Sequence, residues 1–510
     1  MKRIHILTVF VSLLFFAIAA HAGSYPIVDS GQEACFNNSR QISCPDKGDS
    51  FYGQDAQYKG NQPQYRDNGD GTVSDLVTGL MWVKARGPQL SWQEAMDGAK
   101  DCRVGGYTDW RAPTIKELYS LINFNGWVQC SESSSIPFIN TKYFDFKFGD
   151  TSKGNRIIDC QDWSSTSYVS RTMDGNPTAF GVNFADGRIK GYGKTHRRPM
   201  DKKYIRYVRG NPDYGKNIFV KRSDGTIEDR ATGLIWQKTD SGRKLNWEQA
   251  LSYCENLTYG GRNDWRLPSV KELQSIVDYS RSPETTNSAA IDPVFDVTDI
   301  ESYYYSSTTH LDGPSPRAAC YVAFGRAMGN FAPFRSKNKS WMDVHGAGAQ
   351  RSDPKSGDPD AYSSGRGPQG DDIRIYNYVR CVAGGDVETY DPPYVKIPVW
   401  KGTAGFSGSG MRGRNGLQEF GGNPNQNGRS SFNNRNNGEM RDNSMGQGPG
   451  NRQGPPEEAF TACEGRAVGD DCTVQTPHGP LKGLCISRNK RIFCVPEGHG
   501  PGRNRRGGPQ

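Results

Sequence analysis

Two stretches of this chain align with each other without a gap. Residues 91–122 read SWQEAMDGAKDCRVGGYTDWRAPTIKELYSLI, and residues 246–277 read NWEQALSYCENLTYGGRNDWRLPSVKELQSIV. Both stretches carry the pattern W-x-x-A, followed by GG-x-x-DWR-x-P-x-x-KEL. A match of this length and order predicts two tandem copies of one structural unit.

Three more blocks recur in both copies, one upstream and two downstream of the long match. The matching pairs are DGTVSDLVTGLMW (70–82) with DGTIEDRATGLIW (224–236), WSSTS (from Trp163) with YSSTT (from Tyr305), and YVR (from Tyr207) with YVR (from Tyr378). Because all blocks keep their order, we interpret the repeat as a domain duplication, with copy 1 at residues 51–210 and copy 2 at residues 211–384. The period is too long for a solenoid, so each copy is predicted to have its own core.

Turn and cap signals predict the elements inside each copy. Asn-Gly-Asp-Gly at residues 68–71 is a strong hairpin turn signal, and a strand should follow it. Ser91 with Glu94 three residues later is a capping box that starts a helix, and Thr114 starts a second helix. Two later segments alternate like strands, residues 179–184 and 204–209. The predicted fold class is α+β, with two helices against a twisted antiparallel sheet.

The first residues are typical of a Sec-type signal peptide. Lys2 and Arg3 precede an almost wholly apolar run at residues 6–20, and Ala-His-Ala at residues 20–22 fits a cleavage site. We therefore assign residues 1–22 to a signal peptide. The mature chain is expected to be secreted, periplasmic or at the cell surface, with no transmembrane segment.

Twelve cysteines in an exported chain predict disulfides, because exported compartments are oxidising. Three candidate pairs follow from position: Cys254 with Cys381, Cys130 with Cys160, and Cys35 with Cys44. They would close copy 2, an insertion in copy 1, and a short N-terminal loop, respectively. Spacing does not fix connectivity, so other pairings stay open. Aligning the two YVR blocks places Gly210 opposite Cys381, so copy 1 should be bridged differently.

The formal net charge is +8 at pH 7, but most of it lies in the C-terminal end. The part from Lys401 onward holds 15 Lys and Arg against 9 Asp and Glu, which leaves the globular part nearly neutral. Residues 402–456 are rich in Gly, Asn, Arg and Ser and are predicted to be a disordered, flexible linker. Residues 498–510 form a similar basic tail. No nucleic-acid partner is expected.

The repeated blocks resemble the C-terminal domain of the Legionella collagen-like adhesin, a family long listed as a domain of unknown function. The matching strings in copy 1 are DNGDGTVSDLVTGLMW, WQEA, GGYTDWRAPTIKEL, WSST and YVR, and copy 2 adds GGRNDWRLPSVKELQSIVDY and YVRCV. The resemblance covers about residues 52–383. It implies two tandem C-type lectin-like domains and binding of sulfated glycans, with no known enzymatic chemistry. This chain has no collagen repeat, so the resemblance does not imply a trimer.

The C-terminal end resembles a small four-cysteine module found on other exported bacterial proteins. It covers residues 461–497, and its cysteines are Cys463, Cys472, Cys485 and Cys494. Two disulfides among them would let so short a segment fold. The resemblance implies no function for this disulfide-rich module.

The motifs shared by both copies are interpreted as structural and not as catalytic or metal-binding. In each DWR block the Trp should pack in the core, and the Arg should pair with a buried carboxylate. The expected pairs are Arg111 with Glu117 and Arg266 with Glu272. The carboxylates at residues 67, 70 and 75 have the wrong spacing for a calcium loop and fit a turn. No metal site, cofactor or catalytic residue is predicted.

One feature points to a ligand, namely a basic loop before the last strand of each copy. Clustered cations favour sulfate, phosphate or carboxylate groups, and a neighbouring aromatic ring can stack on a sugar. The alternative is a solvated loop without function. The candidate ligand-binding residues are Lys190, Lys194, Arg197, Arg198, Lys202 and Lys203 in copy 1, and Arg335, Lys337, Lys339 and Trp341 in copy 2.

These observations predict an exported binding or adhesion protein that recognises a sulfated or acidic polysaccharide, or another surface polymer. A structural role in an envelope assembly is the alternative, and an exported enzyme on a lectin-like fold is less favoured. The enzyme hypothesis needs reactive thiols or a metal site. A binding module is expected to show few or no free thiols.

Overall fold

The computed structural model describes residues 24–173, 175–195, 202–333, 336, 338–397, 457–464, 466, 470–476, 479–488 and 491–496. The predicted signal peptide (1–22), linker (402–456) and basic tail (498–510) lie outside the described residues. The chain divides into two units, Met1–Pro424 and Asn425–Gln510. Within the described ranges, no helix has both the length and the apolar character that a membrane span requires.

Copy 1 follows the predicted order of strands, two helices and further strands. Its small sheet has the strand order β10-β6-β5-β4. The elements are β4 (Tyr65–Asp67), β5 (Thr72–Asp75), β6 (Leu80–Val83), α1 (Trp92–Asp97), α2 (Ile115–Ser120), β7 (Asp162–Thr172), β8 (Asn176–Asn183), β9 (Arg188–Gly193) and β10 (Val208–Gly210). The predicted hairpin is confirmed by the pairing of β4 with β5. Both predicted helices are confirmed as well, each with a capping box, at Ser91 and Thr114.

Copy 2 repeats these elements and adds an insertion. Its small sheet has the order β11-β12-β13-β19. The elements are β11 (Phe219–Lys221), β12 (Thr226–Asp229), β13 (Leu234–Gln237), α3 (Trp247–Glu255), α4 (Val270–Ser275), β14 (Tyr303–His310), β15 (Ala318–Ala323), β18 (Gln350–Pro354) and β19 (Val382–Gly384). The additional elements are α5 (Pro283–Thr286) and the hairpin of β16 (Met328–Phe331) and β17 (Ser340–Asp343).

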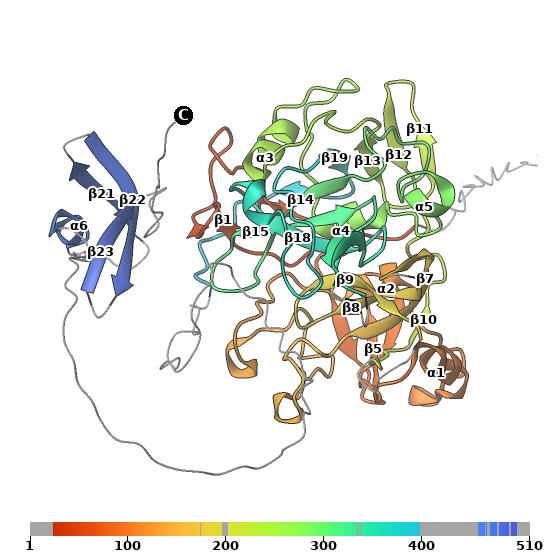
Figure 1. Ribbon diagram of the computed structural model, residues 1–510. Coiled ribbons are helices and arrows are strands. Elements are labelled where there is room, and N and C mark those ends of the chain that lie inside the picture. The colour runs from red at the N-terminus through yellow and green to blue at the C-terminus, as the bar shows by residue number, and fades with distance from the viewer. Residues whose placement is uncertain are drawn as a thin grey trace, which may run out of the picture. The chain divides into compact units, whose positions relative to one another are not determined.

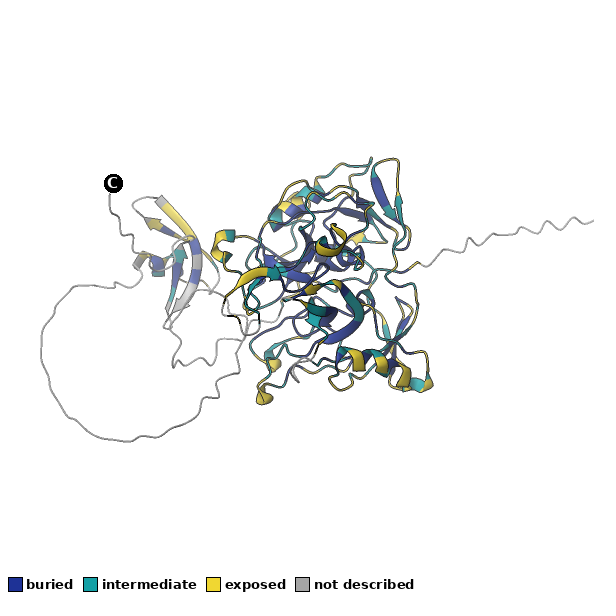
Figure 2. Ribbon diagram, turned by 45° about the vertical axis from the view of Figure 1, so that its right-hand side comes forward, coloured by how far each residue is buried: buried dark blue, intermediate teal, exposed yellow. Residues whose placement is uncertain are grey.

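The two copies share one six-stranded sheet, with the order β14-β15-β18-β9-β8-β7 (Figure 1). Its two halves meet where Ile189 of β9 pairs with Gln350 of β18. Most of its strand residues are buried, as Figure 2 shows. The largest apolar cluster holds side chains of both copies, such as Phe180 and Val322. The expectation of a separate core in each copy holds only in part: smaller clusters around Trp163 and Trp265 belong to one copy each, but the largest cluster is shared. Pairing β9 with β18 covers an open sheet edge of both copies.

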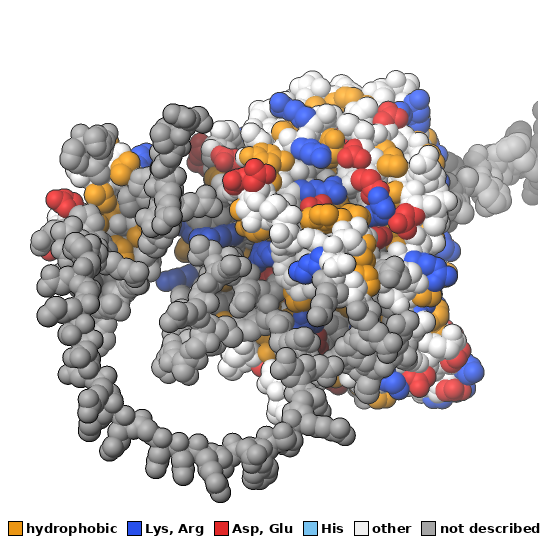
Figure 3. All heavy atoms as spheres, viewed as in Figure 1, with side chains coloured by type: hydrophobic (Ala, Val, Ile, Leu, Met, Phe, Trp, Pro, Cys, Tyr) orange, Lys and Arg blue, Asp and Glu red, His pale blue; other side chains and the backbone are white. Residues whose placement is uncertain are grey.

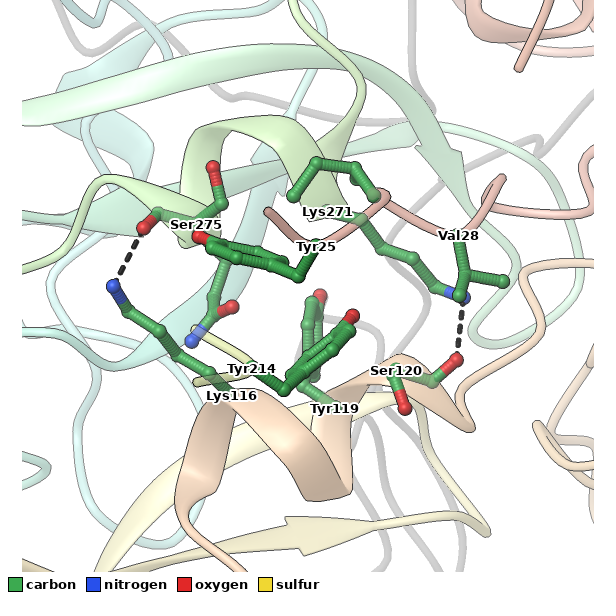
Figure 4. A pocket seen from close by; sticks show the side chains of 10 residues that line it. Tyr25, Val28, Lys116, Tyr119, Ser120, Tyr214, Lys271 and Ser275 are labelled. Atoms are coloured by element: carbon green, nitrogen blue, oxygen red, sulfur yellow. Dashed lines mark hydrogen bonds between the residues drawn. The ribbon is translucent and has the colours of Figure 1, made fainter. Parts of the chain in front are cut away.

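Two lysines of the repeated KEL motif fasten the copies together (Figure 4). Lys116 of α2 donates hydrogen bonds to the carbonyl oxygen of Ser275 at the end of α4 (2.6 Å) and to the side chain of Asn217 (2.8 Å). Lys271 of α4 donates in return to the carbonyl oxygen of Ser120 at the end of α2 (2.9 Å). Burial lowers the pKa of both lysines to about 8. Such reciprocal contacts are expected for two units related by a twofold axis.

An N-terminal segment, residues 24–61, packs mainly on copy 2, so residues 51–61 do not belong to copy 1 as the repeat boundaries suggest. It contains β1 (Cys35–Phe36) paired with β2 (Gln41–Ile42), and the short 3₁₀ helix η1 (Asp55–Gln57). Its strand β3 (Tyr58–Lys59) pairs with β20 (Glu388–Thr389), which follows copy 2. The ring of Phe51 lies 6.2 Å from that of Trp247. The segment therefore gives copy 2 a cover that copy 1 does not share.

Two of the three predicted cysteine pairs are confirmed, Cys35–Cys44 and Cys254–Cys381. The third is wrong, because Cys130 and Cys160 are both free. Cys160 is buried in an apolar cluster with Phe148 and Ala185, where its thiol points to the carbonyl oxygen of Ile157 at 3.6 Å. Cys102 and Cys320 are free as well, so four of the cysteines are unpaired, against the expectation of few or no free thiols.

The last strands of the two copies correspond in a different register from the one predicted from YVR. Val208 pairs with Trp82 in copy 1, and Val382 pairs with Trp236 in copy 2. Tyr207 therefore stands where copy 2 has Cys381, three residues away from the position that YVR suggests. Its hydroxyl donates to the carbonyl oxygen of Ala95 (3.0 Å), so a tyrosine replaces the bridge in copy 1.

The second unit is a small three-stranded antiparallel sheet with one helix. Its elements are α6 (Glu457–Thr461), β21 (Asp471–Thr476), β22 (Gly479–Arg488) and β23 (Arg491–Pro496), in the strand order β21-β22-β23. The two predicted disulfides of this module are present, Cys463–Cys485 and Cys472–Cys494. Three of these sulfurs lie close together as in a metal site, but disulfide bonding removes the thiolates that a metal would need.

Candidate functional site

The DWR motif forms the same ion pair in both copies, with a buried carboxylate in each. Arg111 donates to both carboxylate oxygens of Glu117, and Arg266 does the same to Glu272. The Trp residues before these arginines are buried. The predicted structural role of the motif is confirmed. The arginine of each pair also donates a hydrogen bond to a backbone carbonyl oxygen of the last strand. The motif is thereby linked to the end of its own copy.

A tryptophan under a lysine lies beside this ion pair in each copy. In copy 1 the indole N–H of Trp92 donates to the carbonyl oxygen of Ser164 (3.0 Å), and the ammonium of Lys194 lies 4.0 Å from the centre of the indole ring. In copy 2 Trp247 has the equivalent backbone partner, and Lys355 lies 3.9 Å from its ring. Both contacts are cation–π interactions. The two copies thus build the same constellation.

The copies differ in whether this surface is accessible. We call its copy 1 version the open face and its copy 2 version the covered face. The open face comprises Trp92, Arg111, Ala112, Thr114, Ser165, Thr166, Ser167 and Lys194, all of them half-buried or exposed. The covered face comprises Trp247, Arg266, Leu267, Ser269, Ser307, Thr308, Thr309 and Lys355, of which only Ser269 is not buried. The DWR and SST motifs therefore line a surface that is accessible in copy 1.

The N-terminal segment makes the cover on copy 2 through specific contacts. The hydroxyl of Thr308 donates to the carboxylate of Asp55. The side chain of Gln32 exchanges hydrogen bonds with the backbone of Thr309, at 2.8 and 2.9 Å. Lys355 donates to the backbone carbonyl of Asn37 (3.1 Å). Copy 2 therefore carries a bound segment of its own chain at the position that copy 1 leaves open.

Comparison with protein families matches the Lcl C-terminal domain at residues 71–209 and again at residues 225–342. The chain belongs to the Lcl C-terminal domain family. Comparisons with curated proteins and with solved structures find no match. The second match ends at the inserted hairpin, yet β18 and β19 complete the second Lcl C-terminal domain in the structure.

The structure separates the basic residues predicted for the first Lcl C-terminal domain. Lys194 lies on the open face. Lys202 is beside it and pairs with Glu94 at 3.2 Å. Lys203 is buried, with its ammonium 5.0 Å from the ring centre of Tyr192. Lys190 is largely buried and lies 3.7 Å from the carboxylate of Asp186. Neither of these last two cations is placed for a ligand at the surface.

The basic residues predicted for the second Lcl C-terminal domain form no second open face. Trp341 on β17 is 45% exposed, and Lys339, which directly precedes this strand, is exposed as well. No described contact links this pair to Lys194. The other four predicted residues, Arg197, Arg198, Arg335 and Lys337, lie outside the described residues.

The charge of the open face comes from two cations. Lys194 also donates to the hydroxyl of Ser167 (2.5 Å), and within the described part of the chain no carboxylate lies within ion-pair distance of its ammonium. The side chain of Arg111 is 35% exposed although it pairs with Glu117. Backbone and side-chain hydrogen bonds at Ser91 hold the pKa of Glu94 at about 2, so this neighbouring acid is ionised and engaged.

One face of the molecule can be followed in a space-filling view. On the face seen in Figure 3, Lys and Arg side chains are interspersed with Asp and Glu. Asp70 serves the predicted turn, since its carboxylate accepts from the backbone N–H of Thr72 (3.0 Å) and from its hydroxyl. Asp67 pairs with Lys84. An anionic ligand would therefore be recognised locally and not by a general field.

Sequence reasoning found only one residue of the open face, Lys194. It interpreted the motifs that both copies share as structural and not as part of a site. The signal that marks a site is the difference in burial between equivalent residues, and that difference depends on where residues 24–61 pack. No feature in the sequence of this segment indicates that it covers only copy 2.

Proposed function

We propose that this chain is an exported binding or adhesion protein that recognises an anionic glycan, or another anionic surface polymer, through the open face of copy 1. The observation that carries the proposal is Lys194 over the half-buried ring of Trp92, beside three hydroxyl side chains. An exposed cation next to an aromatic ring and hydroxyls suits an anionic sugar, which offers both a charge and an apolar ring face.

Two further observations support the cellular setting and the fold assignment. Four disulfides in two units favour an oxidising compartment, as expected for a secreted, periplasmic or surface protein. Two short helices packed with antiparallel strands are consistent with a variant of the C-type lectin-like fold in each copy. We propose no catalytic role, since among the described residues no histidine is hydrogen-bonded to the hydroxyls of Ser165 or Thr166.

Heparin, which carries both sulfate and carboxylate groups, is the first probe. Binding of the full chain should be measured by calorimetry at several salt concentrations, and raising the salt should weaken it because a partly exposed charge is screened. Lys194→Gln is expected to lower the affinity about tenfold, the loss of one charge-assisted contact. The matched control is Lys216→Gln, since the side chain of Lys216 is 67% exposed and lies outside copy 1.

Two results would contradict the proposal. Heparin binding that Lys194→Gln and Lys216→Gln weaken equally would point to non-specific attraction. The absence of binding by heparin and by any other anionic polymer would leave the open face without the proposed ligand.

A further inference from the structure

The covered face of copy 2 shows what kind of group fits this surface. The backbone N–H of Val270 donates to the hydroxyl oxygen of Thr308 (2.9 Å), which directs the hydroxyl hydrogen outward to the carboxylate of Asp55. Asp55 is 4% exposed and belongs to the N-terminal segment, so its carboxylate reaches the Thr308 hydroxyl from outside copy 2. We call the position of this carboxylate the seat. A carboxylate is therefore the group that this chain itself places there.

Copy 1 has the same hydroxyl in the same arrangement, and no described residue occupies the position that Asp55 takes in copy 2. The backbone N–H of Ile115 donates to the hydroxyl oxygen of Thr166, again at 2.9 Å. Thr166 is half-buried, whereas Thr308 is fully buried. Among the described residues, no carboxylate accepts from Thr166. The hydroxyl is thus oriented as in copy 2 and reachable from solvent.

The two cations of the open face are also more accessible than their equivalents in copy 2. The side chain of Arg111 is 35% exposed, but that of its equivalent Arg266 is 5% exposed. Lys194 is half-buried, and its equivalent Lys355 is fully buried. The acids that face this region, Glu117 and Glu94, are already paired with Arg111 and Lys202.

We infer that Thr166 is a seat for a carboxylate group, with Arg111 beside it and Lys194 bonded to the adjacent Ser167, and that the ligand is an acidic polysaccharide built from uronic acids. This inference rests on the proposed function and narrows it. The carboxylate would accept from the Thr166 hydroxyl as Asp55 accepts from Thr308, while the sugar ring lies against Trp92. Sulfate esters would then be neither required nor preferred at this seat.

The two seats differ in how strongly they favour the ionised form of a carboxylate. Burial, with Asp29 nearby, raises the pKa of Asp55 to about 7 in copy 2. The open seat of copy 1 keeps contact with water and has two accessible cations, which favour the ionised form. A uronate is therefore accepted in copy 1 as an anion.

The test compares three probes on the full chain: polygalacturonate, which carries carboxylates only, dextran sulfate, which carries sulfates only, and a peptide copying residues 49–59, which contains Asp55. Thr166→Val removes the hydroxyl, and Thr166→Ser keeps it. Thr151→Val, at an exposed position, is the control. Thermal unfolding of each variant shows whether it is folded.

The expected result is that polygalacturonate binds, that Thr166→Val weakens this binding about tenfold, and that Thr166→Ser restores it. Binding of dextran sulfate alone would overturn the carboxylate seat and leave the proposed function intact. Binding of the peptide without either polysaccharide would overturn the assignment to a glycan. Equal binding by Thr166→Val and Thr166→Ser would show that the hydroxyl is not part of the seat.

Discussion

The side chain of Lys116 in copy 1 donates a hydrogen bond to the backbone carbonyl of Ser275 in copy 2. Lys271 returns this contact at Ser120. A buried ammonium needs acceptors, and the last carbonyl groups of a helix lack partners within the helix. The lysine of each KEL motif thus donates a hydrogen bond to a carbonyl group at the end of a helix in the other copy. The repeated motif therefore helps to hold the two copies together.

We expect the unit with both copies to unfold in one transition, because the copies share a sheet and a core. Lys116→Met leaves the Ser275 carbonyl without this donor and should lower the free energy of unfolding by about 1–3 kcal/mol. Tryptophan fluorescence during urea titration measures both effects. Lys216→Met at the surface is the control, and two separate transitions would contradict the shared core.

Asp55→Asn tests the pH dependence of the cover on copy 2. The pKa of Asp55 is raised to about 7 in the folded chain, so its protonated form is favoured there. The stability that this group contributes is complete below about pH 4 and is lost as the pH rises through about 7. Asn cannot ionise.

The stability of Asp55→Asn relative to the unmodified chain should therefore rise between pH 5 and pH 8, by on the order of 1–3 kcal/mol. Urea unfolding of both proteins at each pH gives this difference. Asp213→Asn serves as the comparison, since this side chain is 47% exposed. A difference that is the same at both pH values would show that Asp55 ionises as freely as in water.

Thiol titration tests the cysteine assignment. Without reductant, the unfolded chain should expose four thiols, those of Cys102, Cys130, Cys160 and Cys320. In the folded chain only Cys102 and Cys130 should react readily, because Cys160 and Cys320 are buried. Burial also raises the pKa of Cys160 to about 12, which slows its reaction further. Two thiols or none in the unfolded chain would restore the pairing of Cys130 with Cys160.

An engineered bridge tests the register of the last strand. The structure makes Ala99 and Tyr207 the equivalents of Cys254 and Cys381, so Ala99→Cys with Tyr207→Cys should form a disulfide in copy 1. Cys102→Ser prevents a competing pair. Ala99→Cys with Gly210→Cys, the pair that the YVR alignment suggests, should stay reduced. Mass spectrometry after thiol blocking distinguishes the two, and the opposite outcome would reinstate the YVR register.

Local chemistry made much of the fold predictable from sequence. The capping boxes at Ser91 and Thr114, the hairpin after Asp67 and the Arg111–Glu117 pair depend on residues a few positions apart. The joining of β9 to β18 was not predictable, because an edge strand carries no mark of its partner. Aligning the two YVR blocks gave the wrong equivalent residues. Residues of the two copies correspond when they hold the same position in the strand pairing, whether or not they are the same amino acid.

The site was predictable only in part. Lys194 was among the predicted cations, and its position over Trp92 could not be inferred because the two residues are far apart in sequence. Lys203 was predicted as well, yet the backbone pairing of Leu90 with residue 203 draws it inward. Accessibility of the open face depends on the N-terminal segment, which has no counterpart in front of the second copy.

The tethered N-terminal segment sets the valency of the molecule. The segment belongs to the same chain as the face that it covers, so its binding there is intramolecular and does not depend on protein concentration. A ligand of this surface should therefore titrate with one equivalent per chain. The chain thus has two such domains and, among its described residues, one accessible copy of this surface.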